Sequence, residues 1–192
     1  MKEYSVLLVD DEEDVVEAII QKIDWEGMGY SLLGYAKNGL EALEIAEEKQ
    51  VDVVLTDIKM PYMDGLTLSH KLKELYPSVK IIIFSGFDEF EYAKEAIRLE
   101  AEEYMLKPVD SVELSRIFKK VHERLDEEFD EKQNINRLKN YYMESLPILQ
   151  ESFYTSLIEG NVRQEDLERT MLDYQITLPG KLYCIVVLHN SI

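Results

Sequence analysis

Five short apolar runs, each followed by an amphipathic stretch, constrain the fold of this chain more than any other feature of its sequence. The runs are rich in β-branched residues and predict strands over 4–10, 30–36, 51–57, 79–86 and 102–108. The amphipathic stretches predict helices over 13–23, 38–49, 64–76, 88–100 and from 111 onward. Strand–helix units of this size imply an α/β fold, with a parallel sheet, right-handed crossovers and helices on both faces.

Three residues predict how individual helices begin, bend and end. Asn38 is a favoured N-cap residue, so the Asn-Gly pair here is expected to start a helix rather than turn a hairpin. Pro147 lies inside a long helical pattern and is expected to kink or interrupt it. Gly160 is expected to cap the carboxyl end of that helix.

The sequence from about Ser111 has helical periodicity and no strand pattern. Its apolar residues drift toward an eleven-residue repeat and are Leu114, Phe118, Val121, Leu125, Phe129, Ile135, Leu138, Tyr142, Leu146, Leu149 and Phe153. The part up to about Leu125 is expected to pack on its own sheet. Beyond it the apolar stripe needs another partner, and we favour a parallel helical dimer over a monomeric helical hairpin.

The carboxyl end predicts a short helix over 163–176 and a nearly all-apolar strand over 182–190. Such a strand needs neighbours on both sides and cover on both faces. We therefore interpret it as the opening strand of a further domain and the chain as an amino-terminal fragment, with an edge strand of a small complete domain as the alternative. The expected organisation is one domain over 1–123, a helical linker with coiled-coil character over 124–160, and the start of a truncated domain over 161–192.

The composition and the lengths of the apolar runs limit which partners, cross-links and membrane segments this chain can have. The 192 residues carry a formal net charge of -18, which disfavours binding of nucleic acid or an anionic membrane by these residues because phosphates are repelled. Cys184 is the only cysteine, so an intrachain disulfide and a zinc cluster of cysteines are excluded. The first apolar run is too short for a signal peptide, and no run approaches the roughly 20 residues of a membrane span. We expect a cytoplasmic protein.

Polar residues stand at the carboxyl ends of four predicted strands. They are Asp10 and Asp11, Asp57, Ser85 and Lys107. Ligands of open α/β sheets bind beyond these ends, where the strand order reverses. With the order 2-1-3-4-5, the three carboxylates converge at one edge beside a hydroxyl and an ammonium. An acid after a strand is usually a helix cap and Lys-Pro is usually a turn, but the joint placement is much harder to obtain by chance.

These side chains suit Mg²⁺, which prefers oxygen ligands and keeps some of its waters. Asp11 and Asp57 are expected to bind it directly, and Asp10 directly or through water. The backbone carbonyl of Lys59 is a further expected ligand. The ion relieves the repulsion among adjacent carboxylates. A carboxylate held beside it can attack a phosphoryl donor and form an acyl phosphate.

Four segments resemble the receiver domain of two-component response regulators, a flavodoxin-like (βα)5 family. They are LLVDDE (7–12), VLTDIKMPYMDGL (54–66), IIIFSGFDEFEYAKEAI (81–97) and YMLKPVD (104–110). The resemblance implies that Lys107 precedes a cis peptide bond. It also implies site roles, namely Asp57 as phosphoacceptor, Asp10 and Asp11 as the acidic pocket, Lys107 as the family's lysine, Ser85 as the switch hydroxyl and Tyr104 as the rotating switch aromatic.

SGFDEFEYAKEAI (85–97) and the long helical extension are similar to the YesN type of response regulator, whose full-length members end in an AraC-like helix-turn-helix domain. This resemblance implies a sensor histidine kinase as partner and transcriptional regulation through a DNA-binding domain absent from this chain. It implies no enzyme beyond self-phosphorylation and autodephosphorylation. We expect a homodimer and no membrane partner.

The sequence departs from the family at a few positions. Ser85 replaces the commoner threonine, a mild change, and Glu100 stands where these receivers usually carry glycine. Phe87 and Lys59 occupy positions that govern water access to the acyl phosphate in the family. The bulky apolar side chain of Phe87 is expected to slow hydrolysis of the acyl phosphate. A half-life of only seconds for that phosphoryl group would contradict this expectation.

Two other functions remain open from the sequence. The first is a receiver that is never phosphorylated and only mediates dimerisation. A small Mg²⁺-dependent phosphatase with Asp57 as nucleophile is less favoured, because the haloacid-dehalogenase-like class needs an acid where Lys59 stands. Nucleotide binding is disfavoured, because the sequence has neither a G-x-G-x-x-G nor a P-loop pattern.

Overall fold

The computed structural model describes residues 2–86, 98, 101–108 and 110–177. It divides the chain into two compact units, residues 1–128 and 129–192, which are described separately below. Apart from Arg98, the predicted helix over 88–100 lies outside the described residues, and so does the predicted strand over 182–190.

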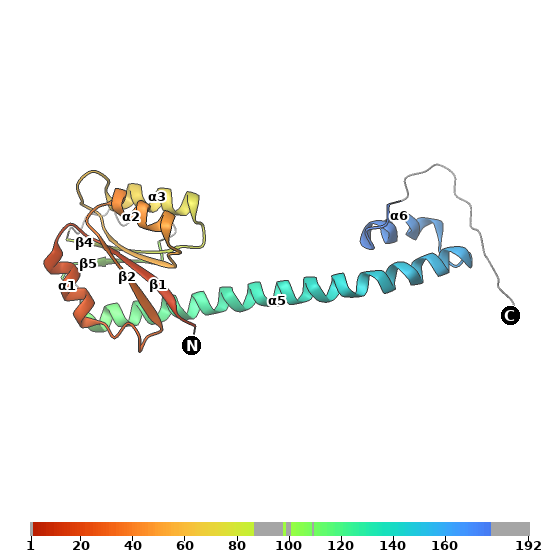
Figure 1. Ribbon diagram of the computed structural model, residues 1–192, viewed down its shortest axis with the longest axis horizontal. Helices are drawn as coiled ribbons and strands as arrows, with labels where there is room; N and C mark the ends of the chain where they lie inside the picture. Colours follow the sequence, from red (N-terminus) through yellow and green to blue (C-terminus); the bar gives the residue numbers. More distant parts are fainter. Residues whose placement is uncertain (1, 87–97, 99–100, 109, 178–192) are drawn as a thin grey trace. The chain divides into compact units, whose positions relative to one another are not determined.

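The first unit is built on one sheet of parallel strands (Figure 1). Within the described residues the strands are β1 (Tyr4–Val9), β2 (Tyr30–Ala36), β3 (Val53–Asp57), β4 (Lys80–Ser85) and β5 (Glu103–Leu106). Their order is β2-β1-β3-β4-β5. The predicted α/β fold and strand order are confirmed, with each strand boundary within two residues of the prediction. The order reverses between β1 and β3, so their carboxyl ends lie side by side.

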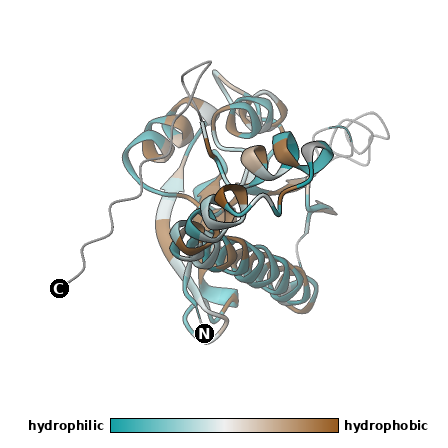
Figure 2. Cartoon of the chain, turned by 90° about the vertical axis from the view of Figure 1, so that its right-hand side faces the viewer, coloured by the Kyte–Doolittle hydropathy of each residue, from teal (hydrophilic) through white to brown (hydrophobic). Residues whose placement is uncertain are grey.

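Helices cover both faces of this sheet. They are α1 (Glu13–Lys22), α2 (Gly39–Glu48), α3 (Gly65–Leu75) and the start of α5 (Ser111–Ile158). Successive residues of β1 alternate between the faces, since Val6 packs with α1 and α5 whereas Leu7 packs with α2 and α3. The helices carry both brown and teal residues in Figure 2, as amphipathic helices do. The Asn38 side chain accepts backbone N–H groups of α2, which confirms it as an N-cap.

The amino-terminal part of α5 completes the core of the first unit. Leu114, Phe118, Val121 and Leu125 are buried against the sheet, as predicted. The hydroxyl of Tyr30 donates to the carbonyl of Phe118 at 2.7 Å, so the polar end of a buried aromatic is satisfied by α5 itself.

The second unit contains the rest of α5 and the short helix α6 (Gln164–Asp173). Pro147 lies within α5, so the expected interruption there is wrong. Gly160 has φ 73° just past the helix end, and the predicted cap is confirmed. Phe153 is buried and its ring packs edge-on against Tyr174, while Gln150 donates to the Tyr174 carbonyl at 2.9 Å.

These contacts pack the segment after α6 against the end of α5, and the choice between a parallel dimer and a hairpin stays a prediction. Ile135 and Leu138 nevertheless remain largely exposed, so part of the apolar stripe is left uncovered within the described residues. Among the helices described, none has the length and apolarity needed to cross a membrane.

Candidate functional site

Strand register brings the predicted site residues to one edge of the sheet. Val9 is paired with Thr56, so Asp10 and Asp57, which follow them, come to lie in the same row. Ser85 is the last residue of β4 and is paired with Leu106. The backbone N–H of Lys107, the next residue, donates to the Ser85 carbonyl at 2.7 Å.

Three carboxylates meet at this edge. One oxygen each from Asp10, Asp11 and Asp57 lies within 4.8 Å of the others. Asp10 is fully buried and Asp57 is 6% exposed, whereas Asp11 is exposed to solvent. Such an all-oxygen set with one open side fits Mg²⁺, which takes a few carboxylates and retains water. Lys59 lies on the exposed loop after β3, and its carbonyl as a ligand stays a prediction.

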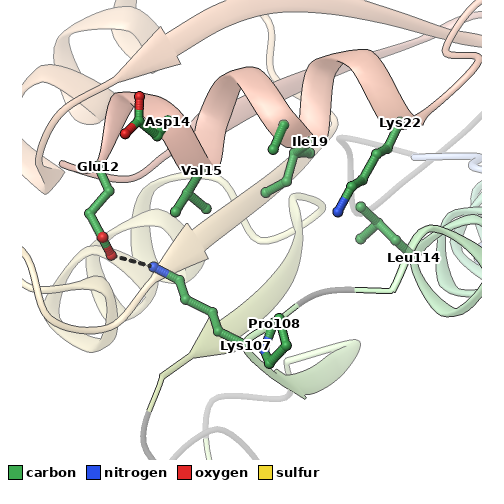
Figure 3. Close-up of a pocket in the computed structure, with 9 residues that line it drawn as sticks. Glu12, Asp14, Val15, Ile19, Lys22, Lys107, Pro108 and Leu114 are labelled. Carbon is green, nitrogen blue, oxygen red and sulfur yellow. Dashed lines mark hydrogen bonds and ion pairs between the residues drawn. The ribbon is translucent and has the colours of Figure 1, made fainter.

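Lys107 supplies the positive charge of the site. Its Nζ is 2.8 Å from Asp10 Oδ2 and 3.6 Å from Asp57 Oδ1, and it lies over the ring of Phe84. The same Nζ also contacts Glu12 Oε1 at 3.2 Å (Figure 3). Glu12 was not predicted as a site residue, and the only trace of it in the sequence is its place in the acidic run after β1.

Burial and neighbouring charges shift the pKa values of Asp10, Asp57 and Lys107. Burial raises the pKa of Asp57, and the neighbouring Asp10 adds to this effect while Lys107 opposes it. Burial also raises the pKa of Asp10, although Lys107 and the Glu12 backbone N–H both donate hydrogen bonds to it. Burial by itself would lower the pKa of Lys107, but the Asp10 hydrogen bond and the two aspartate charges outweigh it and the pKa is raised. Burial therefore outweighs the lysine in setting the pKa values of the two acids.

The loop from β3 to α3 holds Asp57 by close backbone packing. Gly65 donates its N–H to the Ile58 carbonyl at 2.9 Å. A Cβ on Gly65 would lie 1.9 Å from the Asp57 carbonyl oxygen, so only glycine permits this approach. Tyr62, in the same loop, has φ 64° and is 88% exposed, which places an aromatic residue in the left-handed region beside the site.

The two predicted switch residues lie on neighbouring strands. Ser85 is 1% exposed at the end of β4. Tyr104 on β5 is half-buried and packs against the layer formed by α2 and α3. The Lys107–Pro108 peptide bond is cis, as expected. Phe87 and Glu100 lie outside the described residues.

A cavity of about 410 Å³ adjoins the site between α1 and the start of α5. Figure 3 shows Lys107 and Pro108 on one side of it, and Val15 and Ile19 of α1 on the other. The sequence did not predict this cavity, because its wall is formed by elements almost one hundred residues apart.

A doubly covered parallel sheet with an acidic triad and a lysine at its switch point defines a class of signalling domain, and comparison with known proteins agrees. The response regulator receiver domain family matches residues 6–119. The chain belongs to this family. Its acidic triad is typical of the Mg²⁺ site of receivers.

Among curated proteins, the chain is 47% identical over 111 residues to the uncharacterized transcriptional regulatory protein YesN of Bacillus subtilis strain 168, covering 58% of this chain and 30% of the relative. It is 31% identical over 164 residues to the transcriptional regulatory protein HptR of Staphylococcus aureus strain NCTC 8325 / PS 47, covering 84% and 64%. The chain thus spans less than a third of the first relative and slightly under two thirds of the second.

Solved structures agree for the first unit. The REC domain of AraT, a response regulator from Geobacillus stearothermophilus, is 43% identical with a TM-score of 0.62, covering 65% of this chain and 97% of that chain. A two component transcriptional regulator AraC from Clostridium phytofermentans ISDg is 34% identical with a TM-score of 0.59, covering 63% and 94%.

Proposed function

We propose that this chain is the phosphorylatable part of a response regulator, in which Asp57 accepts a phosphoryl group from a sensor histidine kinase. The observation that carries the proposal is the meeting of three carboxylates within 4.8 Å beside the ammonium of Lys107. A receiver used only for interaction has no need of this arrangement, since mutual repulsion among the acids costs stability.

In the proposed reaction an Asp57 carboxylate oxygen forms a bond to phosphorus as the bond from phosphorus to the donor's histidine nitrogen breaks. The leaving imidazole keeps the electron pair of that bond. Lys107 donates to one phosphoryl oxygen and the Ser85 hydroxyl to another. Mg²⁺, which Asp10, Asp11, Asp57 and the Lys59 carbonyl would hold, supplies further neutralisation of phosphoryl charge.

The proposed switch follows from the charge that phosphorylation adds, roughly -1.5 to -2. Ser85 moves toward the phosphoryl group and vacates space for the Tyr104 ring. The surface around β5 and α5 then repacks, which is a local charge event acting on a two-state element.

The proposed output is transcriptional regulation by a longer protein. Relatives named as transcriptional regulators, of which this chain spans only part, support it. In this proposal residues 1–123 are the receiver, 124–160 a linker that pairs in a homodimer, and 161–192 the start of a further domain. DNA is bound only by an AraC-type domain beyond this chain, and the protein works in the cytoplasm.

Incubation with Mg²⁺ and acetyl phosphate, followed by intact mass measurement, tests the proposal. We expect one stable added phosphoryl group, no gain without Mg²⁺, and no gain in an Asp57→Asn variant. An unchanged mass in the wild-type chain would favour a passive interaction module. Continuous release of inorganic phosphate without a stable adduct would favour a phosphatase.

A further inference from the structure

A network of charged side chains lies at the amino-terminal edge of the sheet, opposite the acidic site. It connects the starts of β4 and β5 with the third, fourth and fifth turns of α5. Its members are Lys80, Glu102, Glu103, Lys120, Arg124 and Glu128.

The centre of this network is buried. The side chains of Lys80 and Glu102 are 9% and 8% exposed, and the Lys80 Nζ lies 3.4 Å from Glu102 and 2.5 Å from Glu128. Arg124 forms an ion pair and a hydrogen bond with Glu102 as well. Every buried charge described here therefore has an opposite charge beside it, which is the condition under which a buried ion pair is tolerated.

The pair of Glu103 and Lys120, 3.2 Å apart, extends the network along β5. Glu103 directly precedes Tyr104, the residue proposed to move on phosphorylation. A displacement of β5 at Tyr104 therefore acts on the two acids just before it, and each of these is held by a cation of α5.

The same part of α5 also contacts Tyr4 of β1 and Lys2 just before that strand. The Tyr4 hydroxyl donates to Asp126 at 2.8 Å, and a ring nitrogen of His122 lies 3.1 Å from the Lys2 carbonyl. These contacts hold α5 to a strand that has no predicted part in switching. The helix then continues without a break past Glu128.

We propose that the ion pairs of Glu102 and Glu103 with Arg124 and Lys120 transmit the displacement of β5 to α5, and so carry the phosphorylation state into the linker. This inference rests on the proposed function. The ion pairs that couple β5 to α5 lie at the edge of the sheet opposite the acidic site and include none of the site residues. The contact between Tyr4 of β1 and Asp126 holds α5 in place while β5 moves.

Hydrogen exchange measured by mass spectrometry tests this route on the full chain, with and without Mg²⁺ and acetyl phosphate. In the wild-type chain we expect phosphorylation to change the exchange rates of amides over 118–132 by about threefold or more. In Glu102→Gln and Glu103→Lys variants we expect phosphoryl loading, followed by intact mass, to persist while that exchange response is lost.

Exchanging the charges of one ion pair tests whether the exchange response can be restored. The double variant Glu103→Lys with Lys120→Glu restores opposite charges at the pair and is expected to regain the response. Arg163→Gln, which removes two exposed ion pairs at the start of α6, is the matched control and should respond as the wild type does.

The outcomes separate the two proposals. A wild-type chain that takes no phosphoryl group overturns both. A chain that is phosphorylated without any change in α5 exchange, or single variants that respond like the wild type, overturns the transmission route and leaves the phosphorylation chemistry standing.

Discussion

The two edges of the sheet, where the strands begin and where they end, differ in whether their charges are balanced. They are called the amino edge and the carboxyl edge. At the carboxyl edge, Asp10, Asp11 and Asp57 lie close together, the ammonium of Lys107 contacts Asp10 and Asp57, and the pKa values of both buried acids are raised. At the amino edge, Lys80 and Glu102 are buried with their charges matched. The carboxyl edge is therefore destabilised until a cation balances its carboxylates, whereas the charges of the amino edge are already balanced.

The comparison predicts opposite signs for similar substitutions. Neutralising an acid at the carboxyl edge should stabilise the chain without metal, and neutralising an acid at the amino edge should destabilise it. Stability is measured by unfolding with denaturant, or by thermal melts where a pH series is needed, and circular dichroism confirms that each variant is folded.

The largest effect is expected from Gly65→Ala, which breaks the geometry of the carboxyl edge without altering its charge. The added Cβ would lie 1.9 Å from the Asp57 carbonyl oxygen, so the loop must move. We expect a loss of about 3 kcal/mol in the free energy of unfolding, with weakened phosphorylation. Gly86→Ala, whose Cβ would meet no atom within 4 Å among the described residues, is the control. A loss below about 1 kcal/mol would contradict the proposed rigidity.

At the amino edge, Glu102→Gln is expected to lower the free energy of unfolding by about 2 kcal/mol, because Lys80 and Arg124 lose a buried counter-charge. The exposed ion pairs at the start of α6 offer a matched comparison, since Arg163→Gln should change stability by less than about 0.5 kcal/mol. Equal effects at the two sites would show that burial of the network contributes nothing.

Mg²⁺ is expected to stabilise the carboxyl edge. At a concentration ten times its dissociation constant, the free energy of unfolding of the wild-type chain should rise by about 1.4 kcal/mol. The gain should disappear in Asp11→Asn, because one carboxylate of the set is lost, and should persist in Glu102→Gln. A metal-induced gain of equal size in Asp11→Asn would place the ion elsewhere.

Asp57→Asn is expected to stabilise the metal-free chain by about 1 kcal/mol, or roughly 2–4 °C in Tm. Because the folded pKa of Asp57 is raised above 3.8, the folded state binds more protons than the unfolded state, and stability falls as pH rises through the folded pKa. The advantage of the variant should therefore be absent below about pH 3.8 and full near neutrality. Thermal melts from about pH 3 to about pH 7 measure it, and a destabilised variant near neutrality would refute the charge argument.

The smallest effect is expected at Tyr62. Its φ of 64° costs about 1 kcal/mol for a residue with a Cβ. Tyr62→Gly removes this cost but adds freedom to the unfolded chain, so a net gain of about 0.5 kcal/mol is expected. Tyr62→Ala keeps the backbone strain and removes only the ring. It therefore separates the contribution of the strain from that of the ring. A loss of stability in the glycine variant would mean that the ring packs in solution.

Much of the first unit could be predicted because its information is local. The short apolar runs of β1 and β4 identify strands, and Asn38 identifies a helix start. The site residues Asp10, Asp57 and Lys107 were predicted because each lies at the carboxyl end of a strand, and strand order then determines which ends meet. Their chemical roles remain predictions, since proximity alone does not establish reactivity.

Other features could not be predicted because they depend on contacts between distant segments. Glu12 approaches Lys107 across ninety-five positions, and Lys80 meets Glu128 across forty-eight. Nothing in a charged residue's own neighbourhood indicates which opposite charge it will face. Pro147 was predicted to kink or interrupt α5, and the interruption is wrong because the helix continues through it.

By itself the sequence determined the strands, the helices and the edge at which the acids gather, because periodicity and strand ends are properties of neighbouring residues. Only the tertiary structure decided which charges are buried and which are balanced. Burial and pairing depend on the sheet's register and on how α5 packs beneath it, and those are set by many residues together.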